Sequence, residues 1–322
     1  MADDSGLPPP VAGSGPTGPP GSPRAIAPAD AGPDLWPLAR LAIALRPFRR
    51  NTKAMLGAAL FLAFVALALL APFLPLPNPT ATLFSPEVAP SSTHLLGTTQ
   101  SGQDVLSQLI WGTRASLEVA IGAGVLTTLM AIFIGILSGF AGGIVDEALT
   151  ILTNVFLIIP SLVLVIVVSS YLQGQSNWLI IVLISITSWP WGARVLRSQT
   201  LSLRAKDFVV SSRLAGESTL RIAFVEILPN MISLAAASFF FTCLYAVVTA
   251  ASLQFLGLGD LNTVSWGTML YWANNGEALF VGAWWWFIPP GLCIGLLGAA
   301  FALMNFAVDE VSNPRLRREG AA

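Results

Sequence analysis

Six long apolar stretches restrict the fold of this chain more than any other feature. They cover residues 54–74, 115–140, 149–171, 178–196, 231–257 and 283–305. Each is close to the ~20 residues that an α-helix needs to cross ~30 Å of hydrocarbon. Backbone amides find no water in lipid, so such stretches must form helices or barrel strands, and the alternating pattern of barrel strands is missing. The sequence therefore predicts an all-α polytopic membrane protein with six transmembrane helices.

The charged residues are few and unevenly distributed. They make up 10% of the chain, against about 25% in a soluble domain. If the N-terminus is cytoplasmic, fourteen of the sixteen Lys and Arg residues fall on the cytoplasmic side: Arg24, Arg40, Arg46, Arg49, Arg50, Lys53, Arg197, Arg204, Lys206, Arg213, Arg221, Arg315, Arg317 and Arg318. This positive-inside pattern predicts that both termini are cytoplasmic. The formal net charge of −1 gives no reason to expect a nucleic acid partner.

These patterns divide the chain into four parts. Residues 1–36 are rich in Pro and Gly and are predicted to form a disordered cytoplasmic tail. Residues 37–113 hold the first transmembrane helix and an outer loop, and residues 114–310 hold a core of five transmembrane helices. The core includes the one sizeable cytoplasmic loop, residues 197–230. Residues 311–322 form a cytoplasmic C-terminal tail.

The sequence lacks the residues that ATP hydrolysis, metal binding and ion-coupled transport usually require. Neither lysine, Lys53 or Lys206, follows the glycine that a P-loop requires, so the chain is not expected to hydrolyse ATP by itself. The lone histidine, His94, has no Cys or carboxylate cluster near it in sequence, and we expect no metal site or cofactor in this chain. Charges within the spans lie near the helix ends, which argues against a self-sufficient secondary carrier or channel. A membrane-embedded enzyme would need a polar cluster at depth, and the sequence suggests none.

Residues 207–230 form a polar stretch with roughly helical apolar spacing between two long apolar runs. We expect two short helices joined by a turn at Gly216, with Ser218 capping the second helix and Pro229 ending it. An amphipathic element of this kind either rests on lipid or docks on a partner protein.

Glycines spaced four residues apart occur in two predicted spans. Gly135, Gly139 and Gly143 form one set, and Gly291 and Gly295 form the other. Small residues at this spacing let helix backbones approach closely. The pattern is compatible with a seam between subunits and equally with packing inside the chain.

The stretch 207–230 resembles the cytoplasmic loop of binding-protein-dependent ABC importer permeases. Gly216 and the sequence ILPN (227–230) match that loop, and Asp207, Phe208 and Arg213 match its peptide-transporter subgroup. The sequence Val-Ser-Ser (210–212) replaces the usual Glu-Ala-Ala. LLGTTQSGQDVLSQLIWGTRASL (95–117) resembles the C-type subunit of dipeptide and oligopeptide permeases. GFAGGIVDEAL, SWPWGARVLR, FLGLG with SWGTML, and NPRLR also match in order, so the resemblance covers about residues 45–318.

This resemblance implies a type I ABC importer permease fold, in which the loop forms a coupling helix that docks on a cytoplasmic ATPase. The residues it assigns to ATPase coupling are Asp207, Ser212, Arg213, Leu214, Ala215, Gly216, Glu217 and Ser218, and those at the loop end are Leu228, Pro229 and Asn230. Gly216 would allow close approach to the ATPase. The substrate-binding residues are not identified by this resemblance.

The implied function is that of a permease subunit for peptides in a bacterial or archaeal cell membrane. The implied partners are a homologous B-type permease subunit, two ABC ATPase subunits or domains that bind ATP and Mg, an extracytoplasmic solute-binding protein and the lipid bilayer. The same machinery serves nickel, glutathione or oligosaccharides in other relatives, so the solute stays open.

Overall fold

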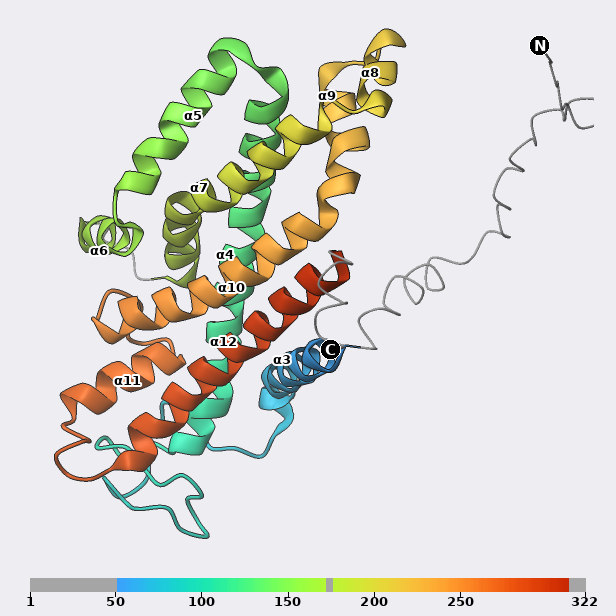
Figure 1. The fold of residues 1–322 in the computed structure, drawn as a ribbon. Helices are drawn as coiled ribbons and strands as arrows, with labels where there is room; N and C mark the ends of the chain where they lie inside the picture. Colours follow the sequence, from blue (N-terminus) through green and yellow to red (C-terminus); the bar gives the residue numbers. More distant parts are fainter. Residues whose placement is uncertain (1–50, 172–175, 313–322) are drawn as a thin grey trace, which may run out of the picture. The chain divides into compact units, whose positions relative to one another are not determined.

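The computed structural model describes residues 51–171 and 176–312, all within the compact unit Arg46–Ala322. In the described part, helices account for all regular structure, with one isolated bridge between Thr98 and Asp104. Elements are labelled as in Figure 1. They are α3 Thr52–Leu70, η1 Ala71–Phe73, α4 Val105–Ala141, α5 Gly143–Ile158, α6 Ser161–Tyr171, α7 Asn177–Leu203, α8 Asp207–Leu214, α9 Thr219–Arg221, η2 Ile222–Ile227, η3 Leu228–Met231, α10 Ile232–Phe255, α11 Trp266–Asn275 and α12 Trp284–Ser312.

The helical polytopic prediction is confirmed, but the third span is not the single helix expected for 149–171. Five helical segments are long and apolar enough to cross a membrane, and α5 and α6 together supply a sixth candidate bent by 86°. The bend falls at Ile159 and Pro160. Proline lacks the N–H that would continue α5, and it disfavours the α conformation of the residue before it. Ile159 is accordingly extended, with ψ 125°. The predicted tail 1–36 and most of 311–322 lie outside the described residues.

Close packing of α4 against α7 forms the centre of the unit. A Cβ atom on Gly135 would lie 2.7 Å from the Ala193 carbonyl oxygen, and one on Gly139 would lie 2.7 Å from Thr200 Cβ. These two glycines therefore pack within the chain and let the two helices approach closely. Gly143 and the pair Gly291 and Gly295 have open space where a Cβ would lie, and none of the described atoms comes within 4 Å of it.

The segment before α4 and the helix α11 are fastened to the ends of the spans by hydrogen bonds. The buried Asp104 caps α4 by accepting from the Leu106 amide at 3.3 Å. Trp266 is fully buried, and its indole N–H donates to the Leu109 carbonyl at 3.1 Å. The indole of Trp285 on α12 donates to the Thr98 carbonyl at 3.2 Å. This end of the molecule is thus held to α4 and α12 by buried polar contacts.

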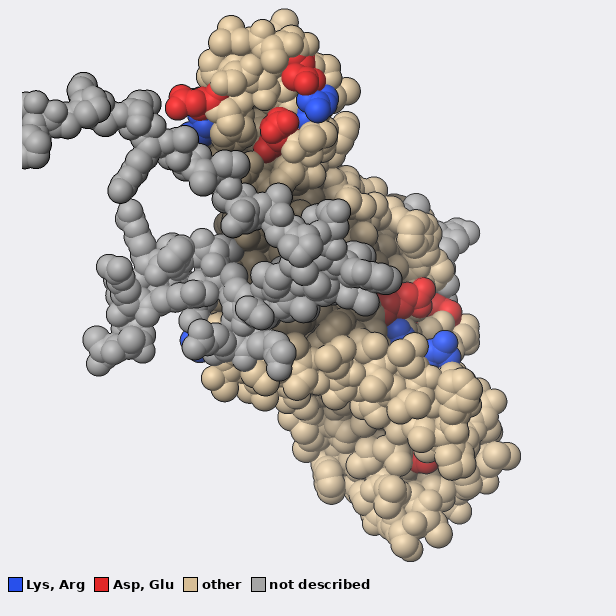
Figure 2. Space-filling model, turned by 90° about the vertical axis from the view of Figure 1, so that its right-hand side faces the viewer, with Lys and Arg blue, Asp and Glu red and all other residues tan. Residues whose placement is uncertain are grey.

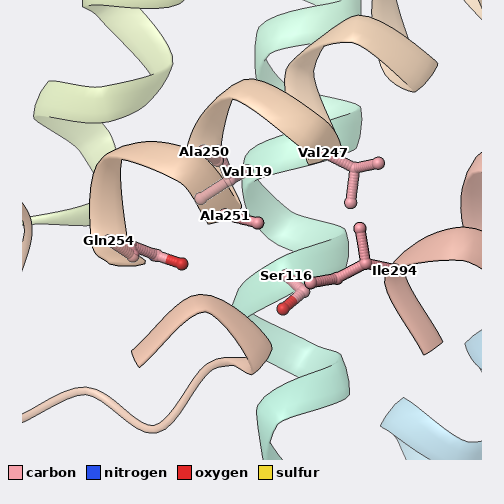
Figure 3. A pocket seen from close by; sticks show the side chains of 7 residues that line it. All are labelled: Ser116, Val119, Val247, Ala250, Ala251, Gln254 and Ile294. Atoms are coloured by element: carbon pink, nitrogen blue, oxygen red, sulfur yellow. The ribbon is translucent and has the colours of Figure 1, made fainter. Parts of the chain in front are cut away.

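A small pocket lies between α4, α10 and α12 (Figure 3). Its lining residues are Ser116, Val119, Val247, Ala250, Ala251, Gln254 and Ile294. Two of its oxygen atoms accept hydrogen bonds: the Ser116 hydroxyl accepts from the Trp266 amide at 3.3 Å, and the Gln254 side-chain oxygen accepts from Ser265 at 2.8 Å. These two oxygens therefore help to position the segment Ser265–Trp266 at the start of α11.

The α5–α6 pair is a peripheral arm with little apolar burial. Thr153 is the one buried residue of α5 and Val165 is the one buried residue of α6. The arm lies at the edge of the bundle beside α7 (Figure 1). At the elbow, the hydroxyls of Ser161 and Tyr245 are 2.8 Å apart and join the arm to α10. Among the described residues, little covers the apolar surface of the arm.

Candidate coupling interface

Helix α8 is a short, mostly exposed helix with charges that suit its dipole. Asp207 lies in its first turn and Arg213 in its last, where a carboxylate and a guanidinium are each favoured. Val209 is fully buried, whereas Val210 and Leu214 have exposed fractions of 45% and 85%. Eight residues are too few for a stable isolated helix, so α8 depends on its contacts with the bundle.

The end of α8 is a Schellman motif built on Gly216. The Gly216 amide donates to the Arg213 carbonyl at 3.0 Å, and the Glu217 amide donates to the Ser212 carbonyl at 3.2 Å. This 5→2 and 6→1 pair needs a left-handed residue at the turn, and Gly216 has φ 80°. None of the described atoms comes within 4 Å of an added Cβ. Within this chain, the glycine is therefore explained by backbone conformation, and its close approach to an ATPase stays a prediction.

Exposed apolar side chains gather on one part of the loop. Val210 and Leu214 are four residues apart, which places them on one face of α8. Leu220, just beyond the turn, is 59% exposed, and Ala215 is also exposed. We call Val210, Leu214, Ala215 and Leu220 the apolar tip. An apolar set of this kind at the end of a helix is typical of a surface that another protein covers.

The charged members of the loop make contacts that hold it in place. The Arg213 guanidinium lies 4.7 Å from the centre of the Phe140 ring, at the end of α4. Glu217 pairs with Arg221 one turn further on. The Ser212 hydroxyl donates to the Phe208 carbonyl at 3.0 Å, so it is engaged in α8 itself. Arg213 therefore links α8 to α4, in addition to any role toward a partner.

Ser218 caps the following helix as expected, accepting from the Arg221 amide at 3.3 Å. The prediction that Pro229 ends this helix is wrong. Helical structure runs from Thr219 to Phe255, through the π-helical η2 and the 3₁₀ turn η3 into α10. The wide π turn before Pro229 makes room for its ring, and the Asn230 side chain donates to the Glu226 carbonyl at 2.7 Å. The helix thus passes the proline because local hydrogen bonds are rearranged around it.

Buried side chains of α8 and of the helix that follows it pack against α4 and α7 in one hydrophobic cluster. Val209 of α8 packs there with Ile222, Ala223 and Ile227 of the following helix. The bundle contributes Ala131, Ile136, Phe140, Trp189, Ala193, Leu196 and Met231. Interiors of this kind are close-packed, so displacement of α8 would be transmitted to α4 and α7.

Polar contacts brace the same end of the bundle. Arg204 at the end of α7 donates to the Gly139 carbonyl at 3.2 Å.

In the space-filling view, acidic and basic side chains lie close together at the end that carries α8 and α9, and the opposite end of that face is largely uncharged (Figure 2). The charged residues of the stretch 207–230 are Asp207, Arg213, Glu217, Arg221 and Glu226.

The structure brings most of the predicted coupling residues together. Asp207 to Ser218 form α8 and its turn. Leu228 packs against the buried cluster, and Pro229 and Asn230 lie exposed in η3, just before α10. Sequence reasoning missed Phe140, because its partner Arg213 is far away in the sequence. It also missed Leu220, whose exposure follows from the turn at Gly216.

Comparisons with known proteins are consistent across the chain. Residues 131–318 match the family described as binding-protein-dependent transport system inner membrane component, and residues 40–93 match the N-terminal TM domain of oligopeptide transport permease C. The oligopeptide transport system permease protein OppC of Bacillus subtilis (strain 168) is 32% identical over 279 residues, covering 85% of this chain and 90% of the relative.

Two further relatives carry dipeptide names. The dipeptide transport system permease protein DppC of Bacillus subtilis (strain 168) is 31% identical over 278 residues, covering 85% of this chain and 86% of the relative. The di/tripeptide transport system permease protein DppC of Pseudomonas aeruginosa (strain UCBPP-PA14) is 33% identical over 279 residues, covering 84% and 90%. The similarity therefore extends over almost the full length of each relative.

Proposed function

Because the chain belongs to the family of binding-protein-dependent transport system inner membrane components, we propose that it is one permease subunit of an ATP-driven peptide importer. The names of its relatives support peptides as the solute class, since they are permeases for oligopeptides, dipeptides and tripeptides. The chain is a multi-pass membrane permease. The absence of a P-loop from its sequence supports a division of labour in which separate ATPase subunits bind ATP and Mg.

The proposed coupling role rests on one observation: helix α8 exposes apolar side chains on one side and buries another against the bundle. Leu214 is 85% exposed on α8, and Val209 on the same helix is fully buried against the ends of α4 and α7. We infer that the apolar tip docks in a groove on an ATPase. The closure of two ATPases around ATP would then move α8 and the rigid cluster behind it, and rock the permease halves between inward and outward states.

The remaining assignments complete the assembly. A homologous B-type permease would form the second half, and an extracytoplasmic binding protein would deliver the peptide to the end opposite α8. The positive-inside pattern supports a cytoplasmic position for α8 and for both termini, in a bacterial inner membrane.

Reconstitution of the complex tests this function directly. The chain is co-expressed with a B-type permease, ABC ATPases and an extracytoplasmic binding protein of the same organism, and the complex is purified through a tag on this chain. We expect the ATPases to co-purify, and proteoliposomes to take up peptide only with ATP and the binding protein. Uptake by this chain alone, driven by an ion gradient, would contradict the proposal and favour a secondary carrier.

A further inference from the structure

Arg194 on α7 is a positive charge without an ion pair among the described residues. Its guanidinium Nη2 donates to the side-chain oxygen of Asn154 on α5 at 3.0 Å. The described ion pairs involve Arg197 with Asp146 and Arg221 with Glu217. Arginine has five N–H donors, so one contact with a neutral amide leaves most of its hydrogen-bonding capacity available.

The position of Arg194 along α7 places it inside the membrane. Helix α7 has 27 residues, about 40 Å, which exceeds a ~30 Å hydrocarbon core by about 10 Å. Arg194 lies nine residues before the end of α7 at Leu203, about 14 Å along the axis. Even if all the excess length projected beyond that end, the Arg194 backbone would lie within the hydrocarbon.

The Arg194 side chain also points toward greater depth. On α7, Arg194 is three residues from Arg197, about 4.5 Å along the axis. On α5, their partners Asn154 and Asp146 are eight residues apart, about 12 Å. The guanidinium of Arg194 thus reaches away from the end that Arg197 and Asp146 mark. Helical side chains tilt toward the N-terminus of their helix, which on α7 favours this direction.

Apolar, exposed side chains lie beside Arg194 in the part of the chain that the structure describes. Trp191, one turn away on α7, is 67% exposed, and Ile158 on α5 is 80% exposed. An arginine facing lipid is costly, so charges inside spans usually face a cavity and a specific partner. Although these neighbours are apolar, the charge of Arg194 therefore indicates that a polar pathway passes this point of the α5–α7 face.

Resting on the proposed function, we propose that Arg194 and Asn154 form a binding site for a carboxylate of the peptide during translocation. Guanidinium groups bind carboxylates through two parallel hydrogen bonds. Since the Asn154 oxygen accepts from Arg194, its amide N–H₂ group faces elsewhere and supplies further donors for the same anion. A lipid phosphate has similar chemistry, and the experiment separates the two.

The test uses the complete importer in proteoliposomes, with trialanine and trialanine amide as probes. The affinity of the binding protein for each probe is measured separately, and uptake is compared at saturation. Arg194→Gln removes the charge and Arg194→Lys keeps it. Asn154→Asp gives the guanidinium a permanent partner within the chain, which strengthens the α5–α7 contact while occupying the site.

We expect Arg194→Gln and Asn154→Asp to lower trialanine uptake roughly tenfold, with an intermediate loss in Arg194→Lys and unchanged uptake of the amide. Equal loss for both probes would overturn the proposal and make Arg194 a structural residue. A loss that depends on phosphatidylglycerol in the vesicles, whichever probe is used, would assign the site to lipid phosphate and overturn it too. If the wild-type importer takes up neither probe, the proposed function itself fails.

Discussion

Arg197 holds both carboxylate oxygens of Asp146 across the α5–α7 contact. Its Nε lies 2.7 Å from Oδ1 and its Nη2 lies 2.9 Å from Oδ2. Thr150, one turn along α5, donates to the same carboxylate at 3.1 Å. Because α5 buries only Thr153, this bidentate pair is a major attachment of the α5–α6 arm to the bundle.

Breaking this pair should loosen the arm. We expect Asp146→Ala to lower the free energy of unfolding by about 1–3 kcal/mol, because the partly buried guanidinium of Arg197 would lose its anion. Thermal unfolding in detergent measures the effect. The exposed neighbour Glu147 gives the control, since Glu147→Gln should change little. Equal melting temperatures for the two variants would contradict this role of the pair.

The two sides of α8 should respond differently to substitution. Leu214→Asn should leave stability within about 0.5 kcal/mol but weaken co-purification of the ATPases, because the side chain is 85% exposed at the apolar tip. Val209→Ala should destabilise the chain by about 1–3 kcal/mol, because it empties buried space. Leu83, 74% exposed in the outer segment, provides the matched control, and Leu83→Asn should keep ATPase binding. Equal ATPase binding by Leu214→Asn and Leu83→Asn would rule out docking through Leu214.

Two substitutions at Gly216 distinguish the effect of an added charge from the effect of backbone strain. Asp and Asn have the same size and both tolerate the left-handed conformation at φ 80° better than most residues. We expect Gly216→Asn to keep most ATP-driven uptake, and Gly216→Asp to remain folded but to uncouple ATP hydrolysis from uptake, because it brings a charge into the docking contact. The ratio of transport to hydrolysis in proteoliposomes decides this. Equal ratios for the two variants would argue against a desolvated contact at this turn.

Much of this architecture could be predicted from residue patterns, for physical reasons. The length of the apolar stretches is set by the hydrocarbon thickness, and the position of Gly216 is set by the local need for a left-handed residue. Other features depend on contacts between segments or on hydrogen bonding that residue patterns do not reveal. The contact of Arg213 with Phe140 joins segments far apart in the sequence, and the passage of Pro229 within a continuous helix depends on the π turn before it.

The bend in the third span, between α5 and α6, also could not be predicted from the sequence. The composition of this span alone gives no sign that α5 and α6 turn by 86° at Pro160, since prolines within α7 and α12 leave those helices continuous. The turn at Pro160 adjoins the contact between Ser161 and Tyr245, a relationship that no local pattern encodes.

Asp104 should make stability depend on pH. Burial raises the pKa of this carboxyl, partly offset by the hydrogen bond from the Leu106 amide. Its folded pKa thus lies above its unfolded one, so its contribution is fully present below the unfolded pKa and is lost as pH rises through the folded pKa. Asp104→Asn keeps the cap without the charge and should remove this loss, whereas Asp104→Ala should cost about 0.5–2 kcal/mol. Melting temperatures between pH 4 and 7 test both, and a wild-type curve parallel to that of Asp104→Asn would contradict the buried charge.

Glycine substitutions distinguish packing within the chain from contacts with other subunits. Gly139→Ala should destabilise the chain by about 1–3 kcal/mol, because the new Cβ would lie 2.7 Å from Thr200 Cβ and 2.9 Å from the Arg197 carbonyl oxygen. Gly291→Ala on α12 meets open space and should be neutral or stabilising by up to about 1 kcal/mol in the isolated chain, since alanine favours helices. Thermal unfolding compares the two variants, and equal stability would refute the close α4–α7 contact. Co-purification of the second permease is measured in parallel: if Gly291→Ala keeps its stability but loses that subunit, α12 meets the partner at Gly291.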